Sequence, residues 1–116
     1  MTRHINPGKR LSGAVVCNGM VYVSGQVPET AYADVATQTK EILAKIDALL
    51  EEAGTDKRNI VNASIWLSDI STFDEMNRPW EEWIAPGPAP ARATVEARIA
   101  NPKYRVEIAV IAAVSP

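Results

Sequence analysis

Apolar and polar residues alternate along the chain in a pattern that predicts short strands separated by two helices. Residues 14–17 and 20–24 are mostly apolar and flank Asn18-Gly19, a pair that tolerates positive φ and favours a two-residue hairpin turn. Residues 60–67 alternate between apolar and polar side chains, which predicts a strand with one buried face that includes Val61.

Two helices are predicted by apolar residues at helical spacing. The first runs from about residue 34 to 53, with Asp34 as its N-cap and Gly54 as the glycine that ends it. Ser71 is the expected cap of a second helix, which runs to about Ile84. Each helix has one apolar face, so both are expected to pack on a sheet.

The last part of the chain predicts two strands, over 91–99 and 104–114, with a break at Asn101-Pro102. His4 lies in a start that is expected to be unstructured. The predicted order is β-β-α-β-α-β-β, an α+β fold in which the helices cover one face of a mixed sheet. With 116 residues, the chain is expected to form one domain over 1–116.

Composition limits the partners of this domain. The net charge of −2 and the pI near 5.4 argue against a general nucleic-acid binder, which usually carries a basic patch. Cys17 is the only cysteine, so no intramolecular disulfide forms. No signal peptide or membrane span is visible, and the expected location is the cytoplasm. A domain of this size buries about two-thirds of its unfolded surface, so oligomerisation would stabilise it.

With one histidine and one cysteine, the chain lacks the ligands for a zinc site and the partners for a Ser/His or Cys/His pair. The remaining candidates lie on the last two strands. Arg92, Thr94 and Glu96 share one face of the first. Glu107 is the only charge in the apolar run 106–114, which is typical of a central strand.

If these two strands form a simple antiparallel hairpin, Glu107 lies opposite Glu96, on the same face as Arg92. Two interpretations of Arg92 and Glu107 are open at this point. They are either members of a structural ion-pair network or parts of a site.

The bulky and reactive side chains elsewhere have structural interpretations. Trp66, Trp80 and Trp83 could line a pocket, but packing of a helix against a sheet or a subunit is the favoured interpretation. Cys17 stands in an apolar context and is expected to be a small core residue rather than a redox group.

Several segments, in order and at the right spacing, resemble the Rid (reactive intermediate deaminase, YjgF-like) family. They are Val21–Pro28, Gln38-Thr39, Ala53-Gly54, Leu67-Ser68-Asp69, Phe73, Met76-Asn77, Pro90–Glu96, Val106-Glu107-Ile108 and Ile111-Ala112. The resemblance implies a chorismate-mutase-like domain that forms a homotrimer, with the helices outside, the sheets around a central barrel, and ligand clefts between subunits.

The resemblance also implies roles for individual residues. Arg92 matches the substrate-binding arginine of the family, and Glu107 matches a glutamate that positions water. The matches to positions near the ligand are Ser24, Gly25, Asn77, the backbone near Ala93, and Thr94. Thr94 replaces the cysteine of the best-known branch, and Leu11 replaces its tyrosine, which indicates a different subgroup.

The implied activity is hydrolysis of 2-imino acids to 2-oxo acids and ammonia, without metal or organic cofactor. Three other functions stay open. The chain could be a non-catalytic trimer that binds 2-oxo acids, an endoribonuclease or translation inhibitor, or an enzyme for a pathway-specific imine or carbamate. The acidic pI weakens the nucleic-acid alternative.

Overall fold

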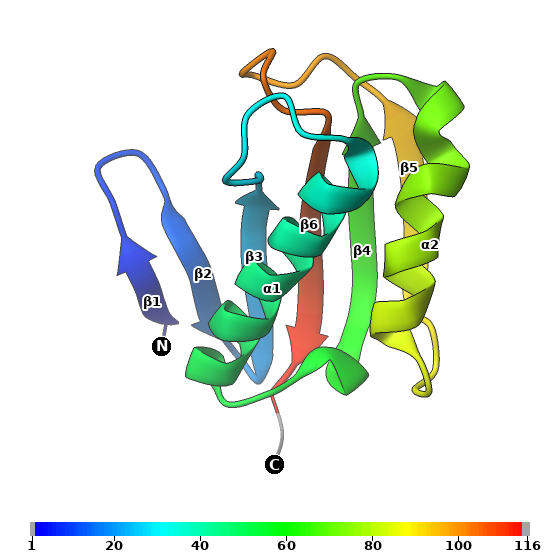
Figure 1. Ribbon diagram of the computed structural model, residues 1–116. Coiled ribbons are helices and arrows are strands. Elements are labelled where there is room, and N and C mark those ends of the chain that lie inside the picture. Colours follow the sequence, from blue (N-terminus) through cyan, green and yellow to red (C-terminus); the bar gives the residue numbers. More distant parts are fainter. Residues whose placement is uncertain (1, 115–116) are drawn as a thin grey trace.

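The computed structural model describes residues 2–114 as one six-stranded mixed sheet with both α-helices on one face (Figure 1). The strand order is β1-β2-β3-β6-β4-β5. The elements are β1 (Thr2–Pro7), β2 (Ser12–Cys17), β3 (Met20–Gln26), α1 (Val35–Ala53), β4 (Ile60–Leu67), α2 (Phe73–Ile84), β5 (Ala91–Glu96) and β6 (Val106–Ala113). The predicted α+β class, with helices on one face of a mixed sheet, is confirmed.

Local sequence signals act as predicted at the first hairpin and at α1. Asn18 and Gly19 have φ of 51° and 75°, so the two-residue turn uses two positive-φ residues. The carboxylate of Asp34 accepts a hydrogen bond from the backbone N–H of Thr37 at 2.7 Å, as an N-cap does. Gly54 ends α1 with φ 90°, in the left-handed region that glycine tolerates.

Two local expectations are wrong. The start of the chain is not unstructured, because residues 2–7 pair with β2 as an edge strand, where Nδ1 of His4 lies 3.2 Å from Oγ of Ser12. Ser71 does not cap α2: it belongs to a short 3-10 turn, Ile70–Thr72, and its hydroxyl donates to Asp69. Residue Thr72 precedes α2 and makes no side-chain cap hydrogen bond.

The expected hairpin between the last two strands is also wrong. β5 runs parallel to β4 at the edge of the sheet, and β6 lies between β3 and β4, antiparallel to both. Residues 91–99 and 104–114 were long enough for a hairpin, but strand β5 ends at Glu96 and β6 begins at Val106. The apolar character of β6 on both faces agrees with its central place.

The two faces of the sheet differ in what covers them. The core lies between the sheet and the helices, and it contains Ile42, Ile46 and Leu50 from α1 and Met76 and Trp80 from α2. Neither helix of the described chain is long and apolar enough to cross a membrane.

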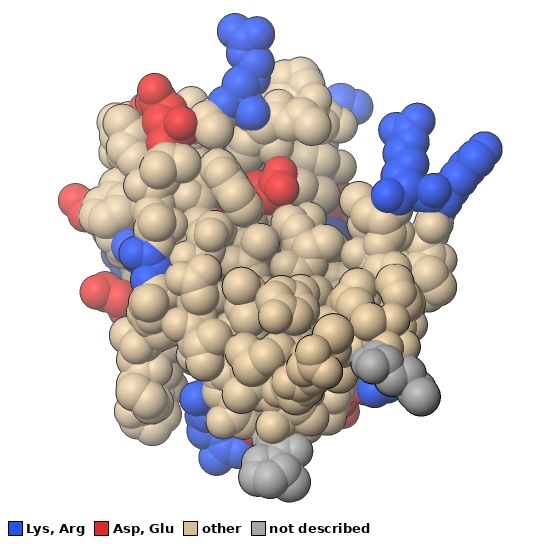
Figure 2. Space-filling model, turned by 180° about the vertical axis from the view of Figure 1, so that it is seen from behind, with Lys and Arg blue, Asp and Glu red and all other residues tan. Residues whose placement is uncertain are grey.

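The other face, here called the open face, has no element of the described residues over it (Figure 2). Figure 2 shows few charged side chains across its middle, with Lys and Arg gathered at the rim. By the strand register, its apolar side chains include Val15, Cys17, Met20, Tyr22, Trp66, Ala93, Val95, Ala109, Ile111 and Ala113. Cys17 is therefore half-buried on the open face, not in the core. Val61, expected on the buried face, is 47% exposed, since β4 has an irregularity between Ile60 and Asn62.

Candidate active site

Arg92 points to the helix face of the sheet and ends beneath α2. It pairs across the sheet with Ala63, which is fully buried, so both side chains face the helices. The guanidinium carbon of Arg92 lies 5.6 Å from the ring centroid of Phe73 and 5.5 Å from that of Trp80. Both distances are within the range of a cation–π contact.

The half-buried Arg92 guanidinium has no acceptor among the residues that the structure describes. Within residues 2–114, Arg92 takes part in none of the side-chain hydrogen bonds and in neither of the two ion pairs, Lys45–Glu29 and Arg58–Asp56. Burial lowers the pKa of Arg92, and the charge of Glu81 opposes this shift. An arginine stays protonated in proteins, so this site holds a cation with free donors.

Two polar atoms on the same side of the sheet lack partners as well. Thr94 pairs with the buried Ile65 and therefore faces the helices, as Arg92 does. Asn77 lies on α2 between Phe73 and Trp80 in sequence, on the helix face that those rings share. Within residues 2–114, Oδ1 of Asn77 and Oγ1 of Thr94 are buried and make no hydrogen bond. Buried polar atoms are normally paired, so these two are candidates for ligand contact.

Glu107 lies on the open face, next to Trp66 in the β4–β6 register. Its carboxylate covers Gly25, where a Cβ would overlap Oε2 of Glu107. Burial raises the pKa of Glu107. No hydrogen bond or ion pair within residues 2–114 involves its carboxylate. A half-buried carboxylate without a donor is costly, and it is free to bind water or a ligand.

The other predicted residues have smaller parts. The hydroxyl of Ser24 donates to the carbonyl of Gly13 at 2.9 Å and accepts from the amide of Gln26 at 3.2 Å, so its own proton is already engaged. Ala93 is exposed on the open face of β5. Across residues 2–114, no three His, Cys, Asp or Glu side chains are grouped as metal ligands.

The structure thus divides the predicted residues into two groups on opposite faces of the sheet. The helix-face group is Asn77, Arg92 and Thr94, and the open-face group is Gly25 and Glu107, whereas Ser24 lies at the irregularity of β3 between Val23 and Gln26. β5 and β6 lie on either side of β4, so Arg92 and Glu107 are two strands apart. Through Ala63, Arg92 is level with Val110 of β6, three residues after Glu107. By sheet spacing, the Cα atoms of Arg92 and Glu107 are roughly 14 Å apart. Arg92 and Glu107 therefore form no ion pair in one chain, and the expectation that they share a face is wrong.

Sequence reasoning did not identify the aromatic neighbours of Arg92. Phe73 and Trp80 are seven residues apart on α2, so they share one face of the helix. That spacing was a visible signal. What the sequence did not show is that β5 runs parallel to β4, which places Arg92 beneath this face.

The whole described fold matches a known family. The family model described as Endoribonuclease L-PSP matches residues 1–114. A RutC family protein of Haemophilus ducreyi is 42% identical over 115 residues, which are 99% of this chain and 98% of that protein. The chain belongs to the Rid family.

Other relatives agree with this assignment to the Rid family. YoaB of Escherichia coli, a RutC family protein, is 46% identical over 95% of this chain and 96% of its own length. The crystal structure of a YjgF-family protein from Neisseria meningitidis has a TM-score of 0.96 at 43% identity, covering 100% of this chain and 97% of that one. YyfA of Yersinia pestis, described as a conserved Rid protein of unknown function, has a TM-score of 0.92 at 32% identity, covering 98% of this chain and 100% of that one.

Proposed function

We propose that this Rid-family protein hydrolyses 2-imino acids to 2-oxo acids and ammonia, in sites formed between copies of the chain. The observation that carries the proposal is the pair of half-buried, unpartnered charges, Arg92 and Glu107. A 2-imino acid needs both: a cation for its carboxylate, and a base for the water that attacks its C=N carbon.

Arg92 is suited to the carboxylate of the substrate. A guanidinium donates two parallel hydrogen bonds to a carboxylate, which fixes the plane of the bound acid. Because no acceptor within residues 2–114 of the same chain engages Arg92, substrate binding breaks no ion pair of that part of the chain. Asn77 and Thr94 offer buried polar atoms beside it for the remaining polar groups of the ligand.

Glu107 is suited to activate water. The protonated imine is electrophilic, so the water oxygen adds to C2 while the carboxylate of Glu107 accepts a proton from the water. The same proton then passes to the amine nitrogen of the tetrahedral adduct. The C–N bond breaks as the carboxylate of Glu107 takes the hydroxyl proton of the adduct, and the departing ammonia accepts that proton. The products are the 2-oxo acid and ammonium, and Glu107 returns to its ionised form.

The opposite faces of Arg92 and Glu107 support a site shared between subunits. One chain holds these groups roughly 14 Å apart with the sheet between them, too far for one small acid to touch both. The apolar open face is the surface that a homotrimer would cover, with Tyr22 and Val95 47% and 49% exposed in the single chain. In such a ring, Arg92 of one subunit would meet Glu107 of the next.

Mixed trimers test the shared site. Arg92→Ala and Glu107→Gln proteins are each assayed alone, then unfolded together in equal amounts and refolded as hybrids. Imine is generated in the assay by an amino-acid oxidase, and its hydrolysis is followed. Random assortment around a ring of head-to-tail contacts gives intact Arg92–Glu107 pairs at about a quarter of the sites. We expect Arg92→Ala to be inactive, Glu107→Gln to have a strongly lowered kcat, and the mixture to recover about that fraction of wild-type activity.

A mixture that stays inactive while both variants form trimers would show that the two residues do not act across a subunit boundary. A well-folded Arg92→Ala trimer that hydrolyses the imine at the wild-type rate would overturn the deaminase itself. If wild type binds 2-oxo acids with saturation but never accelerates imine loss, the protein is a binding trimer. An RNA cleavage assay with the same variants tests the activity after which the family model is named.

A further inference from the structure

The Arg92 guanidinium lies between two aromatic rings of α2. Its central carbon is 5.5 Å from the ring centroid of Trp80 and 5.6 Å from that of Phe73. Phe73 and Trp80 are seven residues apart, two turns of α2, so both rings lie on the helix face that Arg92 contacts.

The rings take the place that a carboxylate usually has beside a half-buried arginine. A side chain with this much rotamer freedom needs a contact that fixes it. No hydrogen bond or ion pair within residues 2–114 fixes the side chain of Arg92. Glu81, whose charge acts on Arg92, makes no ion pair with it. Ring faces attract a cation but accept few of its N–H groups, so the donors stay free.

We propose that Phe73 and Trp80 are positioning residues that hold the Arg92 guanidinium by cation–π contact and keep its donors free for the substrate carboxylate. This inference rests on the proposed function and adds residues that touch Arg92 without taking part in the chemistry. Trp80 is 4% exposed and therefore part of the core, whereas Phe73 is 38% exposed at the surface.

Phe73 allows a sharp test because it is the only phenylalanine of the chain. Growth on 4-fluoro- or 3,4,5-trifluorophenylalanine therefore alters this one ring. Fluorine withdraws electron density from the ring face and changes the ring size little, so the cation–π attraction weakens while the packing is kept. We expect the Kd for 2-oxobutanoate to rise stepwise, by about three- to tenfold in total. An unchanged Kd across the series would overturn the proposal.

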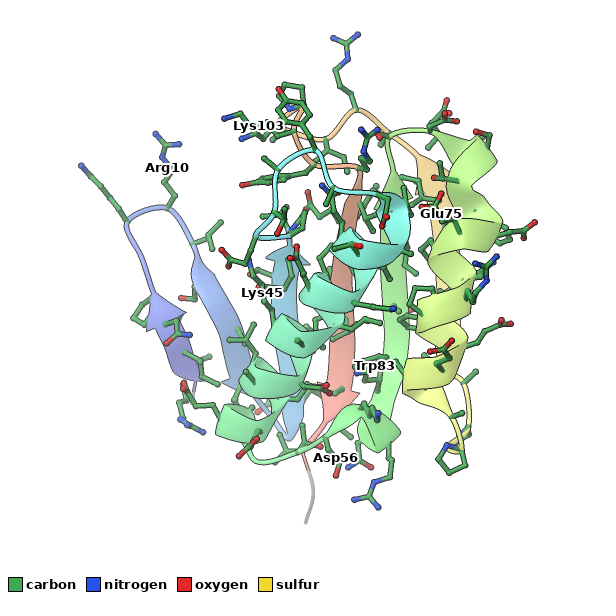
Figure 3. The ribbon with its side chains drawn as sticks, viewed as in Figure 1. Arg10, Lys45, Asp56, Glu75, Trp83 and Lys103 are labelled. Atoms are coloured by element: carbon green, nitrogen blue, oxygen red, sulfur yellow. The ribbon has the colours of Figure 1, made fainter. Side chains whose placement is uncertain are left out.

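Trp80 is tested by substitution, with Trp83 as the matched control. Trp80→Leu should raise KM about tenfold at unchanged kcat, and Trp80→Phe should restore most of the loss. Trp83 lies on the same helix (Figure 3), where it donates to Asp47 of α1 at 2.9 Å and has Lys57 over its ring at 5.4 Å. Its ring centroid is 5.6 Å from that of Trp80, so it shares the packing of Trp80 but makes no cation–π contact with Arg92 within residues 2–114. Trp83→Leu should lower Tm without moving KM. Equal KM shifts in the two leucine variants would show a packing effect and overturn the proposal.

A readout that needs no ligand separates this inference from the proposed function. The Nε–Hε resonance of Arg92, assigned by its loss in Arg92→Ala, reports how firmly the guanidinium is held. It should broaden in the trifluorophenylalanine protein and in Trp80→Leu, and stay sharp in Trp83→Leu. If the resonance broadens in the variants but wild type binds no 2-oxo acid, the proposed function is overturned while Phe73 and Trp80 still hold the Arg92 guanidinium. If wild type binds 2-oxo acid with saturation but the Arg92 resonance does not broaden in the variants, only the positioning role of Phe73 and Trp80 is overturned.

Discussion

Glu107 couples protonation to both activity and stability. Burial raises the pKa of this carboxyl above 4.5, and a base must be ionised to take a proton from water. We therefore expect kcat to fall as the pH falls through the raised pKa of Glu107. Glu107→Gln should lower kcat, keep 2-oxo acid binding and remove this pH dependence. Steady-state kinetics from pH 4.5 to 8 check it, and an unchanged acid limb in the variant would contradict it.

The same pKa predicts an effect of Glu107 on folding. A carboxyl whose folded-state pKa is raised loses stability as the pH rises, because the folded chain favours the protonated form. Glu107→Gln is thus expected to have a higher Tm than wild type at pH 7. The difference should shrink as the pH falls through the raised pKa of Glu107, because both side chains are then neutral. A lower Tm of the variant at pH 7 would indicate a partner for the carboxylate.

Gly25 sets the position of the Glu107 carboxylate. A methyl group at residue 25 would overlap this carboxylate, which sits at the end of a flexible side chain and can turn away. Gly25→Ala should therefore lower kcat with little change in Tm. When combined with Glu107→Gln, it should add almost nothing, because the two changes remove the same group. Fully additive losses would show that Gly25 acts through something other than Glu107.

Sequence reasoning identified these residues but not where they lie. Arg92 and Glu107 stood out because each is a charge on an apolar strand, and that signal does not depend on the fold. Their faces depend on pairing, and a hairpin register puts them on one side. Because β5 pairs in parallel with β4 and β6 is inserted between β3 and β4, Arg92 and Glu107 lie on opposite faces of the sheet. Long-range pairing of this kind leaves no mark on local periodicity.

At the scale of elements, Gln38 of α1 joins the loop before the helix to the loop before β6. Its buried amide donates to the carbonyls of Thr30 and Lys103 at 3.0 and 3.2 Å, and accepts from the N–H of Arg105 at 2.7 Å. Methionine has similar length but replaces none of these bonds. Gln38→Met should lower the free energy of unfolding by about 3 kcal/mol, because three backbone groups lose their partner. Urea denaturation measures the loss, and Glu51→Met at an exposed position of the same helix is the control.

Elements with their own local signals were predicted well. α1 has both caps in its sequence, Asp34 and Gly54, and the first hairpin has Asn18-Gly19. β1 was missed because His4, Asn6 and Pro7 are polar or turn-forming, and only Ile5 of this edge strand is buried. A strand that lies at the edge of a sheet and buries one residue has almost no periodic pattern to detect.

At the scale of the whole molecule, the open face predicts self-association. Tyr22 is 47% exposed near the middle strands of this face, so an isolated chain should tolerate a charge there. A buried trimer interface should not tolerate a charge at residue 22, because a buried charge without a partner is costly. We expect Tyr22→Glu to be folded but monomeric by light scattering, and to lose 2-oxo acid binding, whereas Tyr22→Phe stays trimeric. A monomeric wild type at micromolar concentration would remove the proposed shared site.

The central position of β6 has a consequence for how the chain is made. Of the six strands in residues 2–114, β6 is the last to leave the ribosome, yet it joins β3 to β4. Before it arrives, the sheet exists as two separate pieces, β1-β2-β3 and β4-β5, each with an open edge. Contacts between residues 20–26 and 106–113 close the largest loop of the fold, so their formation is slow compared with that of the hairpins and helices. During synthesis the nascent chain therefore presents two unpaired strand edges, and an extended segment of another polypeptide can occupy them until residue 113 is free.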